Sequence, residues 1–78
     1  MKMRSNITST FGQAVQEVRI ERGLSQEELA RLLGMHRTYI SDVERGIRNT
    51  SIVNAQRIAK ALGVQLSDLL RMAEIEDA

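Results

Sequence analysis

The sequence contains no cysteine and no proline, and it has one histidine among 78 residues. Without cysteine, the chain has no disulfide and no cysteine-based zinc site. His36 alone does not form a metal site unless several carboxylates surround it. A domain of this size gains only roughly 3–5 kcal/mol from its core. We therefore expect well-packed helices, oligomerisation or both to stabilise the fold.

The sequence also lacks long apolar runs. None approaches the roughly 20 residues that span a bilayer, and no apolar stretch follows Lys2 and Arg4 as it would in a signal peptide. Together with the absence of cysteine, this suggests a cytoplasmic protein. No glycine belongs to a phosphate-binding pattern such as GxxxxGK, so no cofactor or small-molecule ligand is predicted.

The charge is small in total but uneven along the chain. The net charge is +1, yet between Arg31 and Lys60 there are six basic residues and only two acidic ones, Asp42 and Glu44. The other eight acidic residues precede or follow this stretch. The basic middle of the chain is typical of a nucleic-acid-binding surface.

Glycines and capping residues divide the chain into helical segments. Ser25 with Glu28 predicts a capping box, Thr10 with Gln13 predicts another, and Ser51 predicts an N-cap. Four glycines each follow a segment with helical apolar spacing, where left-handed geometry ends a helix. These glycines are Gly23, Gly34, Gly46 and Gly63.

The spacing predicts an all-α, compact five-helix domain, because no segment alternates as a strand would. We expect a flexible N-terminal tail over 1–9, the domain over 10–73 and an acidic tail over 74–78. The predicted helices run from about Thr10 to Arg22, Ser25 to Leu33, Arg37 to Arg45, Ile52 to Leu62, and from Ser67 onward. Ile52 is expected on the apolar face of the fourth helix, while Leu32 widens that of the second.

The helix over 37–45 has one apolar and one polar face at about 100° per residue. Ile40 and Val43 point toward the core, whereas the opposite arc collects hydrogen-bonding side chains. That arc holds Arg37, Thr38, Ser41, Asp42 and Arg45. A three-residue turn containing glycine, 34–36, connects this helix to the preceding one, as in a helix-turn-helix. Arginine can bind guanine bidentately and Thr or Ser can bond any base, so this helix is predicted to enter the major groove.

Three motifs extend this prediction to a family. They are Ser-Gln-Glu-Glu-Leu-Ala at 25–30, Ile-Ser-x-x-Glu-Arg-Gly at 40–46 and Ile-Ala-Lys-Ala-Leu-Gly at 58–63. Residues 11–70 resemble the Cro and phage-repressor type (Xre family) of helix-turn-helix transcriptional regulators. The segments 37–41 and 44–49 are also similar to the controller proteins of restriction–modification systems.

The resemblance implies a sequence-specific DNA-binding regulator, such as a repressor, that binds an inverted-repeat operator as a homodimer. It implies a buried ion pair between Arg19 and Glu44. It also implies DNA contacts by residues of the second and third helices and of the loop that follows. These are Gln26, Arg37, Thr38, Ser41, Asp42, Arg45, Arg48 and Asn49.

The roles of three residues in this region stay open. Asp42 either accepts from a cytosine amine or pairs with a neighbour such as Arg45. Tyr39 either packs half-buried or contacts the DNA backbone. His36, which stands where the family commonly has a Ser or Thr N-cap, either contacts DNA or only shapes the helix start.

Two further positions depart from the family. Thr50 stands where proline is frequent, which leaves the loop less rigid. Leu32 stands where a polar residue is usual, which suggests an additional contact or a wider core.

The end of the chain has more apolar residues than one small core requires, so we expect a twofold interface there. Its candidate residues are Val64, Leu66, Leu69, Leu70, Met72 and Ile75.

Other functions explain the sequence less well. Catalysis by Ser41, His36 and Asp42 would need a cleft that one short helix does not supply, so an enzyme is not predicted. The alternatives are the antitoxin of a toxin–antitoxin pair and an interaction module that has lost DNA binding. The basic stretch argues against the interaction module.

Overall fold

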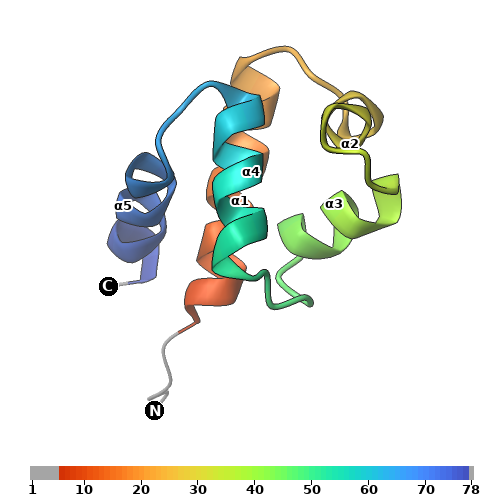
Figure 1. Ribbon diagram of the computed structural model, residues 1–78. Helices are drawn as coiled ribbons and strands as arrows, with labels where there is room; N and C mark the ends of the chain where they lie inside the picture. Colours follow the sequence, from red (N-terminus) through yellow and green to blue (C-terminus); the bar gives the residue numbers. More distant parts are fainter. Residues whose placement is uncertain (1–5, 78) are drawn as a thin grey trace.

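The computed structural model describes residues 6–77, which form five helices and no strand within that range (Figure 1). The helices are α1 (Ile7–Glu21), α2 (Gln26–Leu33), α3 (Arg37–Glu44), α4 (Ile52–Leu62) and α5 (Leu66–Asp77). The predicted all-α, five-helix architecture is therefore confirmed. No helix in this range is long and apolar enough to cross a bilayer.

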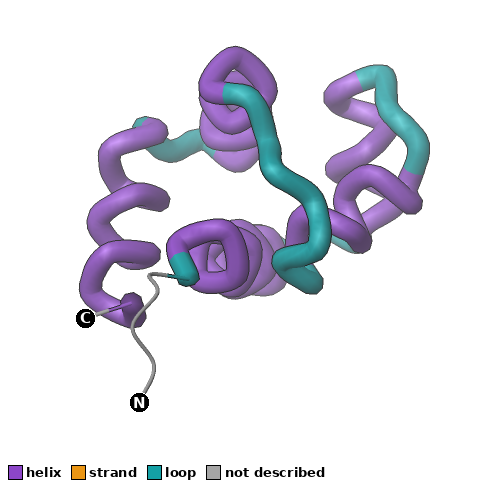
Figure 2. Tube along the Cα trace, turned by 90° about the horizontal axis from the view of Figure 1, so that it is seen from below, coloured by secondary structure: helices purple, strands orange, loops and turns teal. Residues whose placement is uncertain are grey.

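Helix α1 occupies the centre of the fold. It packs against α5 and α3 and also touches α4, while α2 packs on α3 and α4. The α2–α3 pair and α5 lie on opposite sides of α1 and α4 (Figures 1 and 2). The arrangement leaves the outer surface of α2 and α3 free for a ligand.

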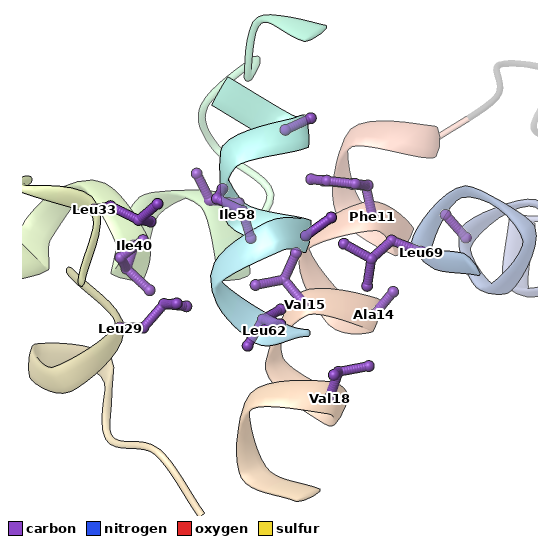
Figure 3. Close-up of a cluster of buried hydrophobic side chains, with 14 of the residues drawn as sticks. Phe11, Ala14, Val15, Val18, Leu29, Leu33, Ile40, Ile58, Leu62 and Leu69 are labelled. Carbon is purple, nitrogen blue, oxygen red and sulfur yellow. The ribbon is translucent and has the colours of Figure 1, made fainter. Parts of the chain in front are cut away.

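Every helix contributes apolar side chains to one core. Figure 3 shows those of α2 and α3 on one side of α4, and those of α1 and α5 on the other. The largest fully buried side chains are Val15, Leu29, Ile40, Val43, Ile58 and Leu69. Complete burial of a Val, Leu or Ile side chain contributes about 1.5–3 kcal/mol, so these residues hold the helices together.

The predicted helix caps and helix-ending glycines are largely confirmed. Ser25 Oγ accepts from the Glu28 N–H at 3.0 Å, and a Glu28 carboxylate oxygen accepts from the Ser25 N–H at 2.8 Å. Ser51 Oγ accepts from the Asn54 N–H at 3.1 Å. The four glycines predicted to end helices all have positive φ.

The start of α1 differs from the prediction. The helix begins at Ile7, and Thr10 lies inside it with its hydroxyl donating to the backbone oxygens of Asn6 and Ile7 at 3.4 and 3.3 Å. A threonine hydroxyl bonded to the preceding turn is satisfied within a helix. The predicted capping box of Thr10 and Gln13 is therefore wrong.

The last helix also extends beyond its predicted limits. Helix α5 begins at Leu66, because Asp68 accepts from the Gln65 N–H at 3.0 Å and so caps the helix earlier than Ser67 would. It continues to Asp77. Residues 7–9 and 74–77, expected in tails, are helical; residues 1–5 and 78 lie outside the described range.

Three apolar residues are placed differently from expectation. Ile52 is 69% exposed, so it does not join the buried face of α4. Leu32 is 62% exposed, which excludes the wider-core interpretation. Leu69 is fully buried in this chain's own core, so its assignment to an intermolecular interface is wrong.

Two glycines let α1 approach the end of α3. A Cβ on Gly12 would overlap the Val43 carbonyl oxygen and lie 2.9 Å from that of Glu44. Gly46 has φ +75°, and a Cβ there would lie 2.7 Å from Ser9 Cα. No larger side chain fits at either position without backbone movement, so these glycines set the distance between α1 and the end of α3.

We predict that Gly12→Ala destabilises the fold by roughly 1–3 kcal/mol, because the added methyl overpacks a backbone contact. Elsewhere in a helix the same change stabilises by about 0.5–1 kcal/mol. Urea denaturation measures the difference, with Gln16→Ala on the exposed face of α1 as control. A Gly12→Ala protein more stable than the wild type would contradict the close approach.

Candidate nucleic-acid interface

Helices α2 and α3 and the turn between them form the predicted helix-turn-helix. Hydrogen bonds from the backbone N–H and then the hydroxyl of Ser25 lower the pKa of Glu28, so the capping carboxylate stays ionised at the start of α2. The turn is closed by the Met35 N–H, which donates to the Ala30 oxygen at 2.9 Å. Helix α3 then begins at Arg37 as predicted, with no side-chain cap from His36.

The two faces of α3 are as the spacing predicts. Ile40, Val43 and Glu44 are buried. The residues expected to contact DNA all lie on the remaining surface of α3, on α2, in the turn between these helices or in the loop that follows α3. His36, Arg37, Thr38, Arg45, Arg48 and Asn49 are exposed, while Gln26, Tyr39, Ser41 and Asp42 are partly buried. All of the predicted residues are therefore at least partly accessible to a ligand.

The ion pair expected between Arg19 and Glu44 is present and bidentate. Arg19 Nε lies 2.6 Å from Glu44 Oε2, and Arg19 Nη2 lies 3.1 Å from Oε1. Both residues are more than nine-tenths buried. The pair joins α1 to the last residue of α3. It therefore determines how α3, the helix predicted to enter the major groove, packs on the domain.

Gln26 connects this ion pair to the surface. Its Nε2 donates to Glu44 Oε1 at 2.9 Å, and its Oε1 accepts from Arg37 Nη1 at 3.0 Å. An ionised carboxylate only accepts, so the amide nitrogen must face Glu44 and the amide oxygen must face Arg37. The exposed guanidinium of Arg37 is thereby held by a chain that begins in the core.

Tyr39 is held from a different direction. The Arg48 guanidinium lies over its ring, 4.9 Å from the centroid, in a cation–π contact. Asn54 Nδ2 donates to the Tyr39 hydroxyl oxygen at 3.3 Å. Tyr39 is partly buried, which agrees with one of the two roles left open for it, while a contact with the DNA backbone stays a prediction.

The loop after α3 is tied to the domain at two points. Asn49 Oδ1 accepts from the Thr8 hydroxyl at 2.9 Å. Asp42 lies 4.0 Å from Arg45 Nη1 and 3.9 Å from Arg48 Nη2. Of the two roles left open for Asp42, this geometry favours pairing with its neighbours.

The sequence did not point to the roles of Thr8, Asn54 and Arg57. Asn54 and Arg57 lie on α4 and act on residues 15 and 24 positions earlier in the chain, Tyr39 and Leu33. Thr8 fell in the segment expected to be a tail. Their spacing within the sequence carries no signal of these partners; in the structure Asn54 is partly buried and Arg57 is exposed.

An apolar groove of about 290 Å³ lies between α4 and α5, with residues of α1 and of the loop after α3 also in its lining. Leu66 and Leu70, two of the residues assigned to a dimer interface, line it. Val64 lines a neighbouring hollow with Leu66. Met72 and Ile75 do not line the groove, because at about 100° per residue they fall on the other flank of α5.

Comparisons with known proteins agree with this geometry. The family model "Helix-turn-helix" matches residues 15–69. The chain is 51% identical to the control protein C.BamHI of Bacillus amyloliquefaciens, over 94% of this chain and 91% of that protein. It is 40% identical to the control protein C.MunI of a Mycoplasma species, over 92% and 99%.

A solved structure is similar as well. The restriction–modification controller protein C.AhdI of Aeromonas hydrophila superposes with a TM-score of 0.77 at 47% identity. The superposition covers 80% of this chain and 94% of that one.

We predict that Glu44→Ala costs roughly 3–5 kcal/mol of folding stability, because it leaves Arg19 buried without its counter-charge. Loss of DNA binding would then follow from unfolding. Urea denaturation tests this, with Glu17→Ala on the exposed surface of α1 as control, expected within about 0.5 kcal/mol of the wild type. Equal stabilities of the two variants would show that the pair contributes little.

Proposed function

The chain belongs to the helix-turn-helix family of DNA-binding transcriptional regulators, and on that premise we propose that it binds an inverted-repeat operator as a homodimer. The observation that carries the proposal is the chain of contacts from Arg19 through Glu44 and Gln26 to Arg37. It orients a guanidinium outward at the start of α3, the end that reaches deepest into the major groove.

Base reading falls to the side chains at the start of α3. Arg37 suits bidentate binding of guanine O6 and N7, and Thr38 suits any base. Both are exposed. Ser41 lies on the same arc one turn later, and Gln26 supports Arg37 from α2.

The backbone of the DNA is gripped beside this site. Arg45, Arg48 and Asn49 extend from the loop after α3, and all three are exposed. His36 and Tyr39 border the same surface near the turn. Charge contacts of this kind give affinity and position without sequence information.

The second copy is proposed to seat on the groove between α4 and α5. Its apolar lining includes Ile7, Phe11, Ile52, Leu66 and Leu70, and residues 48–50 also line it. In a twofold contact the same patch of each copy covers the other, which suits a self-complementary apolar groove. Since residues of the loop after α3 belong to the lining, dimerisation would bring two such loops together.

Control of a restriction–modification system is the biological role we propose. The support is the similarity to C.BamHI, C.MunI and C.AhdI, each named as a control or controller protein.

Selection of bound duplexes from a random DNA pool is expected to return an inverted repeat with half-site centres about 34 Å apart. Arg37→Ala should lose roughly 1–3 kcal/mol of affinity and relax the preference at one base pair per half-site. Arg45→Ala should weaken binding to all sequences alike and reduce the salt dependence.

Arg45 is the matched control because it is exposed and, among the described residues, its single ion pair is with Asp42, 4.0 Å away. If Arg37→Ala left the selected sequence unchanged, the proposed reading face would be wrong. A selected site without symmetry would count against the homodimer.

We expect Ile52→Asp to shift the protein from dimer to monomer in sedimentation. Ile52 lines the groove but is 69% exposed in the single chain, and a carboxylate in the first turn of a helix is favourable. The folded monomer should therefore keep its stability. Val53→Asp is the control, since Val53 is 64% exposed and lies outside the groove lining. Equal association of the two variants would place the interface elsewhere.

A further inference from the structure

Arg57 and Asn54, on α4, form a polar chain that reaches the candidate interface. Arg57 Nη2 donates to the Leu33 carbonyl oxygen at 2.6 Å, and Arg57 Nη1 donates to Asn54 Oδ1 at 3.3 Å. Asn54 Nδ2 in turn donates to the Tyr39 hydroxyl oxygen at 3.3 Å. One end of the chain is the last carbonyl of α2, and the other is a side chain of α3.

The direction of every bond in this chain is determined by its charged member. A guanidinium only donates, so the amide oxygen of Asn54 must face Arg57. The amide NH₂ group then faces Tyr39, and the hydroxyl oxygen of Tyr39 must accept from it. The hydroxyl proton is consequently left for another acceptor.

A hollow beside Tyr39 suits an anionic acceptor. It is lined by Gly34, Met35, His36, Thr38, Tyr39 and Arg48. No carboxylate belongs to this lining, and its polar side chains are hydrogen-bond donors. Arg48 also lies over the Tyr39 ring, which places a positive charge next to the side chain that carries the hydroxyl.

We infer that a phosphate of bound DNA occupies this hollow and that Asn54 is the positioning residue that commits the Tyr39 hydroxyl to donate to it. The inference rests on the proposed DNA binding. Asn54 acts through Tyr39 and does not need to touch the nucleic acid. Arg57 acts one step further away by fixing the orientation of the Asn54 amide.

An isosteric substitution reverses the polarity of the chain. The carboxylate introduced by Asn54→Asp still accepts from Arg57, now as an ion pair, so the contact between α2 and α4 is kept. It has no proton to give to Tyr39. The Tyr39 hydroxyl then donates to this carboxylate, and its proton is withdrawn from the phosphate.

A double-mutant cycle with Tyr39→Phe separates this reversal from the effect of the added charge. Affinities are measured at one salt concentration on the duplex that the wild-type protein selects. Tyr39→Phe should weaken binding roughly tenfold, as expected for loss of a hydrogen bond to a charged group. In the wild-type background Asn54→Asp should weaken binding by at least the same factor. In the Tyr39→Phe background the factor by which Asn54→Asp weakens binding should be about ten times smaller.

Thermal melting of each variant shows whether the fold is kept, and Asn54→Asp should melt no lower than Asn54→Ala. Additive effects of Asn54→Asp and Tyr39→Phe would overturn the inference, because Asn54 would then act independently of the hydroxyl. Unchanged binding by Tyr39→Phe would also overturn it while leaving the proposed function intact. Absence of DNA binding by the wild-type protein would instead overturn the proposed function.

Discussion

The ion pair between Arg19 and Glu44 is the interaction on which the DNA-facing half of the molecule depends. A buried ion pair is costly to desolvate, and it persists only where the other donors and acceptors of both groups find partners. Arg19 also donates to the Leu24 carbonyl at 2.8 Å, and Glu44 also accepts from Gln26. The pair therefore joins α1, the start of α2 and the end of α3 at one point. In a chain without cysteine, no disulfide does this work.

Two hydrogen-bond chains of fixed polarity run from the scaffold to the exposed face of α3. One begins at Glu44, a pure acceptor, and ends at Arg37; the other begins at Arg57, a pure donor, and ends at Tyr39. An amide side chain lies in the middle of each chain. The charged group determines which end of the amide faces it, and the other end of the amide then determines whether the next side chain donates or accepts. Because the amides are oriented by charge and not by packing alone, α3 presents its polar groups with little freedom to reverse them. Such preorganisation lowers the ordering cost of binding.

Residues acting locally were predictable from the sequence, and those acting across the fold were not. Ser25 and Glu28 are three positions apart, so their capping box is written in the spacing itself. The capping prediction for Thr10 was wrong because a hydroxyl can cap a helix or bond within it equally well, and the choice depends on the preceding turn. Gly12 carried the signal of an unexplained glycine inside a helix, but only the fold places α3 against it. The partners of Asn54 and the burial of Leu69 were not predictable for the same reason. Helical spacing shows which residues share a face of the helix, and the neighbouring helices decide what covers that face. The resemblance supplied the Arg19–Glu44 pair, which spacing alone would not have joined.

The placement of charge explains how a chain with a net charge of +1 suits a polyanion. Long-range attraction to DNA is weak at so small a net charge, so affinity has to come from groups held in position. Asp42 strengthens this dependence on position, because it lies about as close to Arg45 as to Arg48 and partly neutralises both. In the proposed complex a phosphate replaces the Asp42 carboxylate as the partner of both arginines. The binding free energy gained from these contacts with the DNA backbone is therefore smaller, and by the same amount on every DNA sequence. Selectivity then depends on Arg37 and Thr38, whose contacts vary with the base edges and not with the charge density of the duplex.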